Sequence, residues 1–505
     1  MKTKNSVTYY ILGILIVLVL INVISDKFFL RLDFTEDNRY TLSRATKDIL
    51  KSLNDPVTIT AYFSVDLPPD IAKTRRDFKE LLIEYSNSSY GMLVYEFVNP
   101  NEDEETEREA AMAGVQPVII NIREKDQVKQ QKAFLGAVIQ IGEETDVIPF
   151  MQPGAAMEYA LSSSIKKISV IDKPVIGFLQ GHSEPSIRSY QQVYSQLSVL
   201  YNIEPVSLTD STNELSKYKT VAIVAPKDSF PDNHLKQLDE YLNSGGKLFI
   251  AYNRVDGDLS KATGSSLTTG METWLTKKGI VIEDNFIIDA NCASVGVRQQ
   301  QGMFSFNTQV QFPYIPIITN FEDHPVTKGL ETVILQFVST ISFTGDSTVS
   351  FTPLAKTSKK SGTQSSPLYF DISKQWTEVD FPLSNLIVAA HVKGELAGKN
   401  NSEMIIISDG NFPVNGEGQA AQQLQEDNVS LMVNSIDFLS DDTGLIELRT
   451  KGVTSRPLDQ IEDSTKSVLK YLNFLLPIIL IIIYGIFRMQ VKRNIRIKRM
   501  EEGYV

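Results

Sequence analysis

The chain has almost no cysteine and few histidines. Cys292 is the only cysteine among 505 residues, which excludes an intramolecular disulfide and a zinc site of the CxxC type. Four histidines are present, far apart in the sequence and without any HxH or HxxxH pair: His182, His234, His324 and His391. We therefore expect neither a cofactor nor a metal centre, although residues that are distant in the sequence can meet in space.

Motifs that bind nucleotides or calcium are also missing. The sequence contains no GxxxxGK[ST] phosphate loop, so ATP hydrolysis would have to come from a partner. The acidic run NEDEETERE, residues 101–109, lacks the spacing of an EF-hand and is expected to begin a solvated helix. These absences exclude a P-loop ATPase and an EF-hand protein.

Basic residues are fewer than acidic ones, and several lie near the two ends. The chain has 49 Lys and Arg against 61 Asp and Glu, a formal net charge of −12. Residues 1–25 and 488–502 hold eight of the bases and two of the acids, so the part between them has 41 bases and 59 acids, a charge of −18. A body this acidic is not expected to bind nucleic acid, or anionic lipid over a broad surface.

Charge is absent from two long apolar stretches. Residues 5–25, NSVTYYILGILIVLVLINVIS, have the length of one transmembrane helix. Residues 471–487, YLNFLLPIILIIIYGIF, are also uncharged, and 12 of these 17 are Leu, Ile or Phe, which favours membrane insertion by roughly 5 kcal/mol. We predict transmembrane helices at residues 9–25 and 471–488, both in contact with membrane lipid.

The flanking sequences predict the orientation of these helices. No small-x-small cleavage site follows the first apolar stretch, which favours an uncleaved anchor. Basic residues lie before the first helix, in residues 1–8, and after the second, mostly in residues 489–505. The positive-inside rule then places both termini in the cytoplasm and residues 26–470 on the other side of the membrane.

Residues 26–170 are predicted to form a first extracytoplasmic α/β domain. Five segments have strand patterns: 56–64, 92–100, 117–123, 134–142 and 146–151. Four segments have helical patterns: 44–53, 75–87, 107–115 and 155–168. The resulting β-α-β-α-β-β-α order is typical of a thioredoxin-like domain. The segment that would carry a redox CxxC motif reads SVDLPPDI and has no thiol, which excludes redox chemistry there.

Residues 171–452 are predicted to form a second, larger α/β domain, followed by a juxtamembrane segment at 453–470. Strand patterns alternate with helical patterns and lie at 173–180, 203–208, 218–226, 247–253 and 280–289. Later strands are expected at 385–394 and 403–412, and a last helix at 428–440. The alternation predicts a doubly wound parallel sheet with helices on both faces.

Several stretches together carry a resemblance to a known family. RLDFTEDNRYTLS (31–43) follows the first apolar stretch, and FLQGHSEPS (178–186) ends the first strand of the second domain. GGKLFIAYN (245–253), MIIISDGNF (404–412) and NSIDFLSDDTGLIELRTKG (434–452) complete that domain. In their order and spacing the chain resembles the GldG-type auxiliary proteins of gliding-motility ABC transporters, which belong to a broader family of ABC-transporter accessory proteins. The resemblance covers nearly the whole chain.

The resemblance implies both a fold and a role. It implies a flavodoxin-like second domain, of the kind shared with class I glutamine amidotransferases and an intraflagellar transport subunit. It also implies an accessory subunit in the inner (cytoplasmic) membrane, with a large periplasmic part, beside a separate ABC permease and ATPase. In gliding Gram-negative bacteria that set is associated with surface motility and protein secretion. The family's loop usually reads Gly-His-Gly-Glu, whereas Ser183 replaces the second glycine here, which weakens a role that needs close backbone approach to a ligand.

Polar residues follow three of the predicted strands. In a doubly wound sheet, ligands bind at the carboxyl ends of the strands, near the point where the strand order reverses. A polar rim is expected there, and its residues are candidates for binding a ligand or partner: Gly181, His182, Ser183, Glu184, Asn253, Arg254, Asp409, Gly410 and Asn411. For the first of these loops we favour a tight turn in which His182 and Glu184 only hydrogen-bond neighbouring loops, and a ligand or partner site is the alternative.

Catalysis by the Gly-His-Ser-Glu loop is a further alternative, as in an extracytoplasmic hydrolase or amidase. A nucleophile elbow needs GxSxG or GxCxG, but Pro185 stands two residues after Ser183. Ser183 is also adjacent to His182, and adjacent side chains project differently from the backbone. Cys292 has no elbow sequence around it. We predict a non-catalytic auxiliary subunit that binds cargo or envelope partners, and a pure scaffold between transporter and surface machinery is the remaining alternative.

Overall fold

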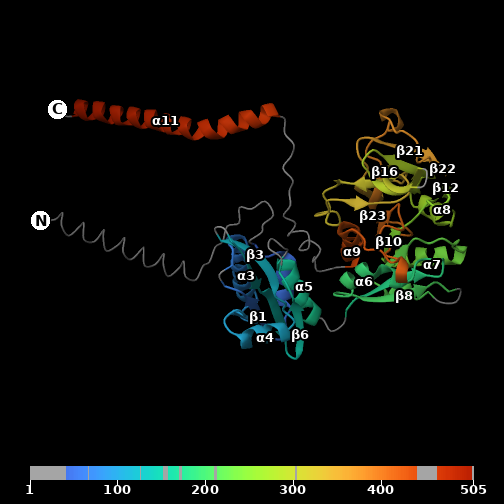
Figure 1. Cartoon of the computed structure of the whole chain (residues 1–505), viewed down its shortest axis with the longest axis horizontal. Helices are drawn as coiled ribbons and strands as arrows, with labels where there is room; N and C mark the ends of the chain where they lie inside the picture. The colour runs from blue at the N-terminus through green and yellow to red at the C-terminus, as the bar shows by residue number, and fades with distance from the viewer. Residues whose placement is uncertain are drawn as a thin grey trace. The chain divides into compact units, whose positions relative to one another are not determined.

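The computed structural model describes residues 41–65, 67–124, 127–151, 157–169, 173–209, 213–301, 304–440 and 463–502 (Figure 1). The chain divides into two compact units, residues 1–453 and 454–505. The first predicted transmembrane helix, at 9–25, and the N-terminal segment 1–8 lie outside the described residues. The molecule is a mixed α/β protein with parallel and antiparallel sheets.

The first part of the chain folds around a four-stranded sheet with the order β2-β1-β5-β6. Its strands are β1 (Val57–Phe63), β2 (Leu93–Val98), β5 (Leu135–Ile141) and β6 (Glu144–Ile148). β1 pairs parallel with β2 and antiparallel with β5, and β5 pairs antiparallel with β6. The helices are α2 (Arg44–Lys51), α3 (Pro69–Ser88), α4 (Glu104–Met112) and α5 (Met157–Ser169). Ser43 and Asp103 cap α2 and α4, because each side chain accepts a backbone N–H in the first turn.

One predicted strand of this part lies outside its main sheet. β3 (Val118–Glu124) pairs only with β4 (Gln127–Ala133), in a separate antiparallel hairpin. The prediction that residues 117–123 close the sheet is therefore wrong. The sequence QVKQQKA of β4 is polar and shows no apolar alternation, so it was not predicted as a strand.

An eight-stranded sheet organises the second part of the chain, in the order β17-β20-β23-β24-β10-β9-β7-β8. Five strands pair in parallel: β7 (Val175–Gln180), β8 (Asn202–Ser207), β9 (Thr220–Val224), β10 (Lys247–Ala251) and β24 (Ser402–Ile407). Three more extend the sheet antiparallel: β17 (Asn320–Phe321), β20 (Val349–Lys356) and β23 (Ile387–Gly394). The predicted parallel sheet is thus the larger half of a mixed one.

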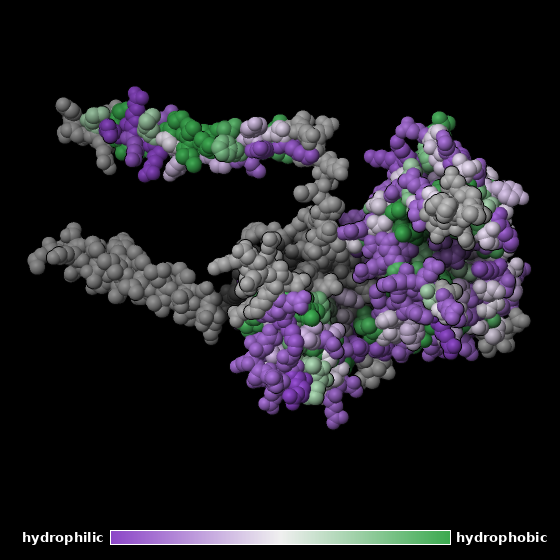
Figure 2. Space-filling view, in the orientation of Figure 1, coloured by the Kyte–Doolittle hydropathy of each residue, from purple (hydrophilic) through white to green (hydrophobic). Residues whose placement is uncertain are grey.

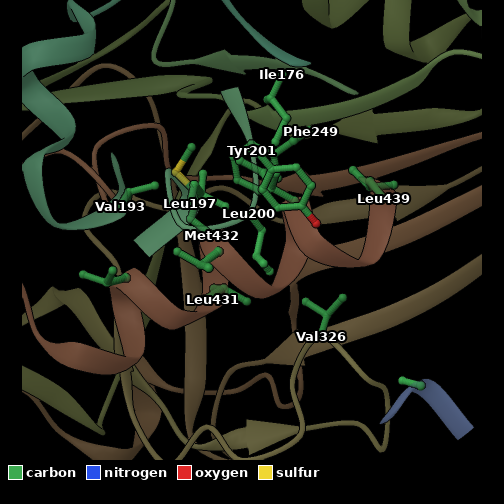
Figure 3. Close-up of a cluster of buried hydrophobic side chains, with 14 of the residues drawn as sticks. Ile176, Val193, Leu197, Leu200, Tyr201, Phe249, Val326, Leu431, Met432 and Leu439 are labelled. Atoms are coloured by element: carbon green, nitrogen blue, oxygen red, sulfur yellow. The ribbon is translucent and has the colours of Figure 1, made fainter. Parts of the chain in front are cut away.

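Helices cover both faces of the parallel strands. They are α6 (Gln191–Leu197), α7 (Asp232–Asn243), α8 (Met271–Thr276) and α9 (Glu426–Ser440). Phe249 of β10 packs in one apolar cluster with α6 and α9, whereas its neighbours Leu248 and Ile250 pack in another with α7. Figure 3 shows Leu197 of α6 beside Met432 of α9 in the first cluster. This alternation is the period-2 pattern of a strand buried on both sides.

The chain between β10 and β24 adds small antiparallel sheets. Their strands are β11 (Val255–Asp258), β12 (Thr263–Ser266), β13 (Ile280–Ile282), β14 (Asn285–Asp289), β15 (Cys292–Gln301), β16 (Phe304–Ile318), β18 (Val333–Ile334), β19 (Ile341–Phe343), β21 (Ser361–Ser365) and β22 (Leu368–Tyr369). The single predicted strand at 280–289 is two strands, β13 and β14, which pair with β19 and β21. It does not belong to the large sheet, so that prediction is wrong.

The described part of the C-terminal unit is one long helix, α11 (Asp463–Glu502), of 40 residues. Residues Thr465–Lys498 form the one helix in the described parts of the chain that is long and apolar enough to cross a membrane, with a mean hydropathy of 2.2. The predicted span at 471–488 lies within it. Figure 2 shows an apolar band along this helix with polar residues on both sides of the band.

Candidate functional site

The loop after β7 folds back on itself. Gly181 and Ser183 have positive φ angles, +119° and +60°, which turn the chain sharply at the end of the strand. The Glu184 carboxylate accepts the backbone N–H of His182 at 2.7 Å, and its other oxygen lies 3.3 Å from Nδ1 of the same histidine. Both side chains are buried, with 3% of His182 and 1% of Glu184 exposed. The predicted tight turn is therefore present, held by these two residues.

The ring of His182 has partners on every side. It stacks on Phe230, with 3.7 Å between the ring centroids and 8° between the planes. Its Nε2 atom lies 2.9 Å from Nδ1 of His234, in the first turn of α7. Glu184, His182 and His234 thus form one hydrogen-bonded row. His234 and Phe230 were not predicted, because contacts across about 50 residues leave no periodic signal in the sequence.

The loop after β9 completes this arrangement. The backbone N–H groups of Lys227 and Asp228 donate to the carbonyl oxygen of His182 at 2.9 and 3.0 Å. The Ser183 hydroxyl donates to a carboxylate oxygen of Asp228 at 2.6 Å. Exposed polar side chains of Ser183, Lys227 and Asp228 therefore lie over the buried histidine and glutamate.

The loops after β10 and β24 are joined in the same way. Asn253, directly after β10, accepts the backbone N–H of Gly410 at 2.6 Å. A Cβ atom added at Gly410 would lie 2.7 Å from Cα of Ala225, the residue after β9, so only glycine fits there. The four loops at the carboxyl ends of β7, β9, β10 and β24 are therefore connected in series.

Asp409 is fully buried and binds the backbone. Its carboxylate accepts the N–H groups of Gln336 and Asn411, each at 2.7 Å. Burial raises the pKa of Asp409 to about 7, although these backbone donors act in the opposite direction. Asp409 holds the segment around Gln336 against the loop that contains Asn411, and Asn411 itself is half-buried.

Arg254 is directed away from this cluster. Its guanidinium donates to the carbonyl oxygen of Leu267 at 2.7 Å and lies 3.2 Å from the Asp284 carboxylate. Both partners belong to the chain between β10 and β24. In the described part of the chain, the contacts that connect the other predicted rim loops to one another do not include Arg254, whose partners lie further along the chain.

Residues 173–441, more than half of the chain, match the protein family described as an ABC-type uncharacterized transport system. The chain belongs to this family. It is an auxiliary component of an ABC-type transport system, and the family implies association with transporter components. The predicted resemblance to ABC-transporter accessory proteins is confirmed at this level. Residues 36–140 match a second family, a domain of unknown function.

Individual relatives of this family member are distant. An uncharacterized protein of Borreliella burgdorferi is 24% identical over 391 residues, 75% of each chain. The mmIFT52 N-terminal domain is 14% identical with a TM-score of 0.35, over 52% of this chain and 97% of that one. A ThuA-like protein from Parabacteroides merdae is 12% identical with a TM-score of 0.28, over 58% and 94%. Structural scores this low carry no argument about function.

The chemistry available at the rim of this auxiliary component is that of hydrogen bonding. The Ser183 hydroxyl is directed to Asp228, and both ring nitrogens of the neighbouring His182 have other partners. Ser183 is therefore paired with a carboxylate and not with a histidine, so these contacts do not form a Ser–His pair. In the described ranges, His, Cys, Asp and Glu do not gather in groups of three or more suited to a metal ion.

Proposed function

We propose that the protein is a non-catalytic, membrane-anchored auxiliary subunit of an ABC transporter, whose extracytoplasmic part binds cargo or an envelope protein. One observation carries the proposal: an auxiliary-family match over residues 173–441 and a membrane-length helix, α11, occur in the same chain. No phosphate loop is present in the sequence, so ATP turnover belongs to the partner ATPase. The GldG-type resemblance extends the proposal to gliding motility and protein secretion.

We assign two named folds to the extracytoplasmic part. The order β2-β1-β5-β6, with β5 antiparallel to its neighbours, supports a thioredoxin-like domain over residues 26–170. The five parallel strands, taken in chain order, lie in the order 2-1-3-4-5, which supports a flavodoxin-like domain over residues 171–452. The β7 loop and the β9 loop flank the point where that order reverses, so the rim stands where such domains bind ligands.

The rim is proposed as a surface for a protein partner. Its buried groups, His182 and Glu184, are saturated by internal hydrogen bonds, which leaves little for a small ligand to bind. The exposed layer above them, Ser183, Lys227 and Asp228, presents a hydroxyl, a cation and an anion. A mixed polar surface of this kind suits the rim of a protein interface.

A hydrolase that uses this loop would behave differently on mutation. It requires that His182→Ala abolish a turnover while the fold survives. The auxiliary-subunit proposal expects His182→Ala to loosen the fold, because the ring stacks on Phe230 and bridges Glu184 and His234. A urea titration of the purified variant, beside an esterase and amidase screen of the wild type, separates these outcomes.

Co-purification tests the proposal directly. The full chain, tagged and extracted from membranes in mild detergent, should bring with it a polytopic permease and an ATPase that can be identified by mass spectrometry. A matched control is the same tag on an unrelated protein with two transmembrane helices. Recovery of the chain alone, also after crosslinking in intact cells, would refute the assignment to a transporter.

A further inference from the structure

The helix α11 continues well beyond its apolar stretch. Residues 471–487 are uncharged, and the helix then runs without a break to Glu502. At 1.5 Å per residue the continuation is about 22 Å long. Residues 488–498 contain five basic residues and no acidic one. The helix therefore presents a strong positive charge immediately after its membrane-spanning part.

Three of these cations form a stripe on one side of the helix. Arg488, Lys492 and Arg496 are spaced by four residues, so about 100° per residue places them within an arc of about 80°. Arg493 and Lys498 fall outside this arc on either side. The opposite side carries uncharged residues at the same depth: Gln490, Asn494 and Ile497.

Aliphatic side chains border the stripe. Val491 and Ile495 lie next to it on the helix surface, and both are exposed, at 39% and 47%. A group of basic residues immediately after a membrane span is typical of a juxtamembrane segment that meets anionic headgroups. The acidic residues of α11 nearest in sequence, Glu501 and Glu502, come only at its last turn. The counter-charge for the stripe must therefore come largely from outside this helix.

We propose that Arg488, Lys492 and Arg496 bind the anionic headgroups of lipids at the membrane surface where α11 emerges. This inference rests on the proposed membrane span. Seventeen uncharged residues cover about 26 Å, close to the thickness of the hydrocarbon core, so Arg488 lies at its boundary. Lys492 and Arg496 follow at about 6 and 12 Å, within side-chain reach of the headgroups. If an acidic protein surface bound these cations instead of lipid headgroups, they would not need to begin directly at the end of the membrane span.

Two double variants of the full chain test the stripe. K492Q/R496Q removes one Lys and one Arg from the stripe, and R493Q/K498Q removes the same two residue types outside it. Both keep Arg488 at the end of the span. Each protein is reconstituted in phosphatidylcholine vesicles with a trace of spin-labelled phosphatidylglycerol or phosphatidylcholine, and electron paramagnetic resonance gives the relative association of the two lipids.

The wild type should prefer phosphatidylglycerol, and this preference should fall in 1 M salt. In the stripe variant the preference for phosphatidylglycerol should be at least about fivefold lower. Two cations are removed, and each cation at an anionic surface contributes up to about that factor. R493Q/K498Q should change this preference less than twofold.

Equal losses in both variants, or no preference in the wild type, would overturn the proposal. So would an unchanged preference in the stripe variant with loss of ATPase co-purification, which would assign the stripe to a protein partner. Failure of the wild type to co-purify a transporter would instead refute only the proposed function.

Discussion

His391, a largely buried histidine on β23, illustrates how residues far apart in the sequence meet. Its ring centroid lies 5.2 Å from that of His324 and 5.0 Å from that of Phe438 in α9. Its Nε2 atom is buried without a hydrogen-bond partner. Burial, followed by the charge of His324, lowers the pKa of His391 to about 4, so the ring is neutral at neutral pH.

Acid should therefore weaken the contribution of His391 to the stability of the second domain, whereas Asp409, whose pKa burial raises to about 7, acts in the opposite direction over the same interval. The pKa of histidine in an unfolded chain is about 6.5, so the unfolded state binds the proton more strongly and the free energy of unfolding falls as the pH drops from 6.5 through 4. Between pH 7.5 and 5.0 His391 should remove about 2 kcal/mol. Both tryptophans, Trp274 and Trp376, lie in this domain, so their fluorescence in urea titrations measures the loss.

The matched variant is His391→Leu, which fills a similar volume and cannot bind a proton. Over the same pH interval its free energy of unfolding should fall by about 2 kcal/mol less than that of the wild type. If the two proteins lost equal stability, the acid sensitivity would have to come from other groups.

At the scale of elements, the loops at the strand ends fix one another's positions. The contact between the loops after β9 and β24 has no space for a side chain, because a Cβ at Gly410 would approach Ala225 to 2.7 Å at Cα and 2.9 Å at N. Ala225 itself has a φ of +48°, a conformation that few alanines adopt. Neither backbone can move without disturbing the Gly410–Asn253 hydrogen bond.

Gly410→Ala should therefore lower the free energy of unfolding of the second domain by about 2–4 kcal/mol, through overpacking and a weakened buried hydrogen bond. The control is Gly296→Ala in β15, where a Cβ would meet only Gln309 Nε2 at 3.7 Å. That variant should change stability by less than about 1 kcal/mol. Comparable urea midpoints for the two variants would show that the strand-end contact is not rigid.

The ends of β7 and β24 were predictable because these strands are largely apolar runs that stop at polar or glycine residues. The direction of pairing was not, since the run at 385–394 reads the same for a parallel or an antiparallel neighbour, and β23 is antiparallel. Local patterns also cannot tell which of two neighbouring polar residues contacts the rim. Arg254 directly follows the rim residue Asn253, yet its partners lie at Leu267 and Asp284.

At the scale of the whole molecule, the charge distribution determines the expected orientation. The acidic body and the basic ends of the chain have opposite signs. If the chain has the two proposed spans, the positive-inside rule predicts that its basic ends lie in the cytoplasm and that residues 26–470 lie on the other side of the membrane. Helix α11 is long and apolar enough to be one of these spans, and the other, at 9–25, is a proposal that rests on the sequence.

Cysteine labelling tests this topology, and the scarcity of cysteine makes the test clean. In a Cys292→Ser background the full chain has no other thiol, so single cysteines can be introduced by Ser265→Cys, Thr3→Cys and Gly503→Cys. Ser265 is exposed on β12. A membrane-impermeant maleimide should label Ser265→Cys once the outer membrane is permeabilised, and the two terminal variants only after the inner membrane is lysed.

Labelling of Thr3→Cys together with Ser265→Cys would mean that α11 is the only span, since a single crossing leaves the N-terminus on the same side as the body. Labelling of both termini but not of Ser265→Cys would mean that the orientation is reversed, and the acidic body would then face the cytoplasm with the partner ATPase.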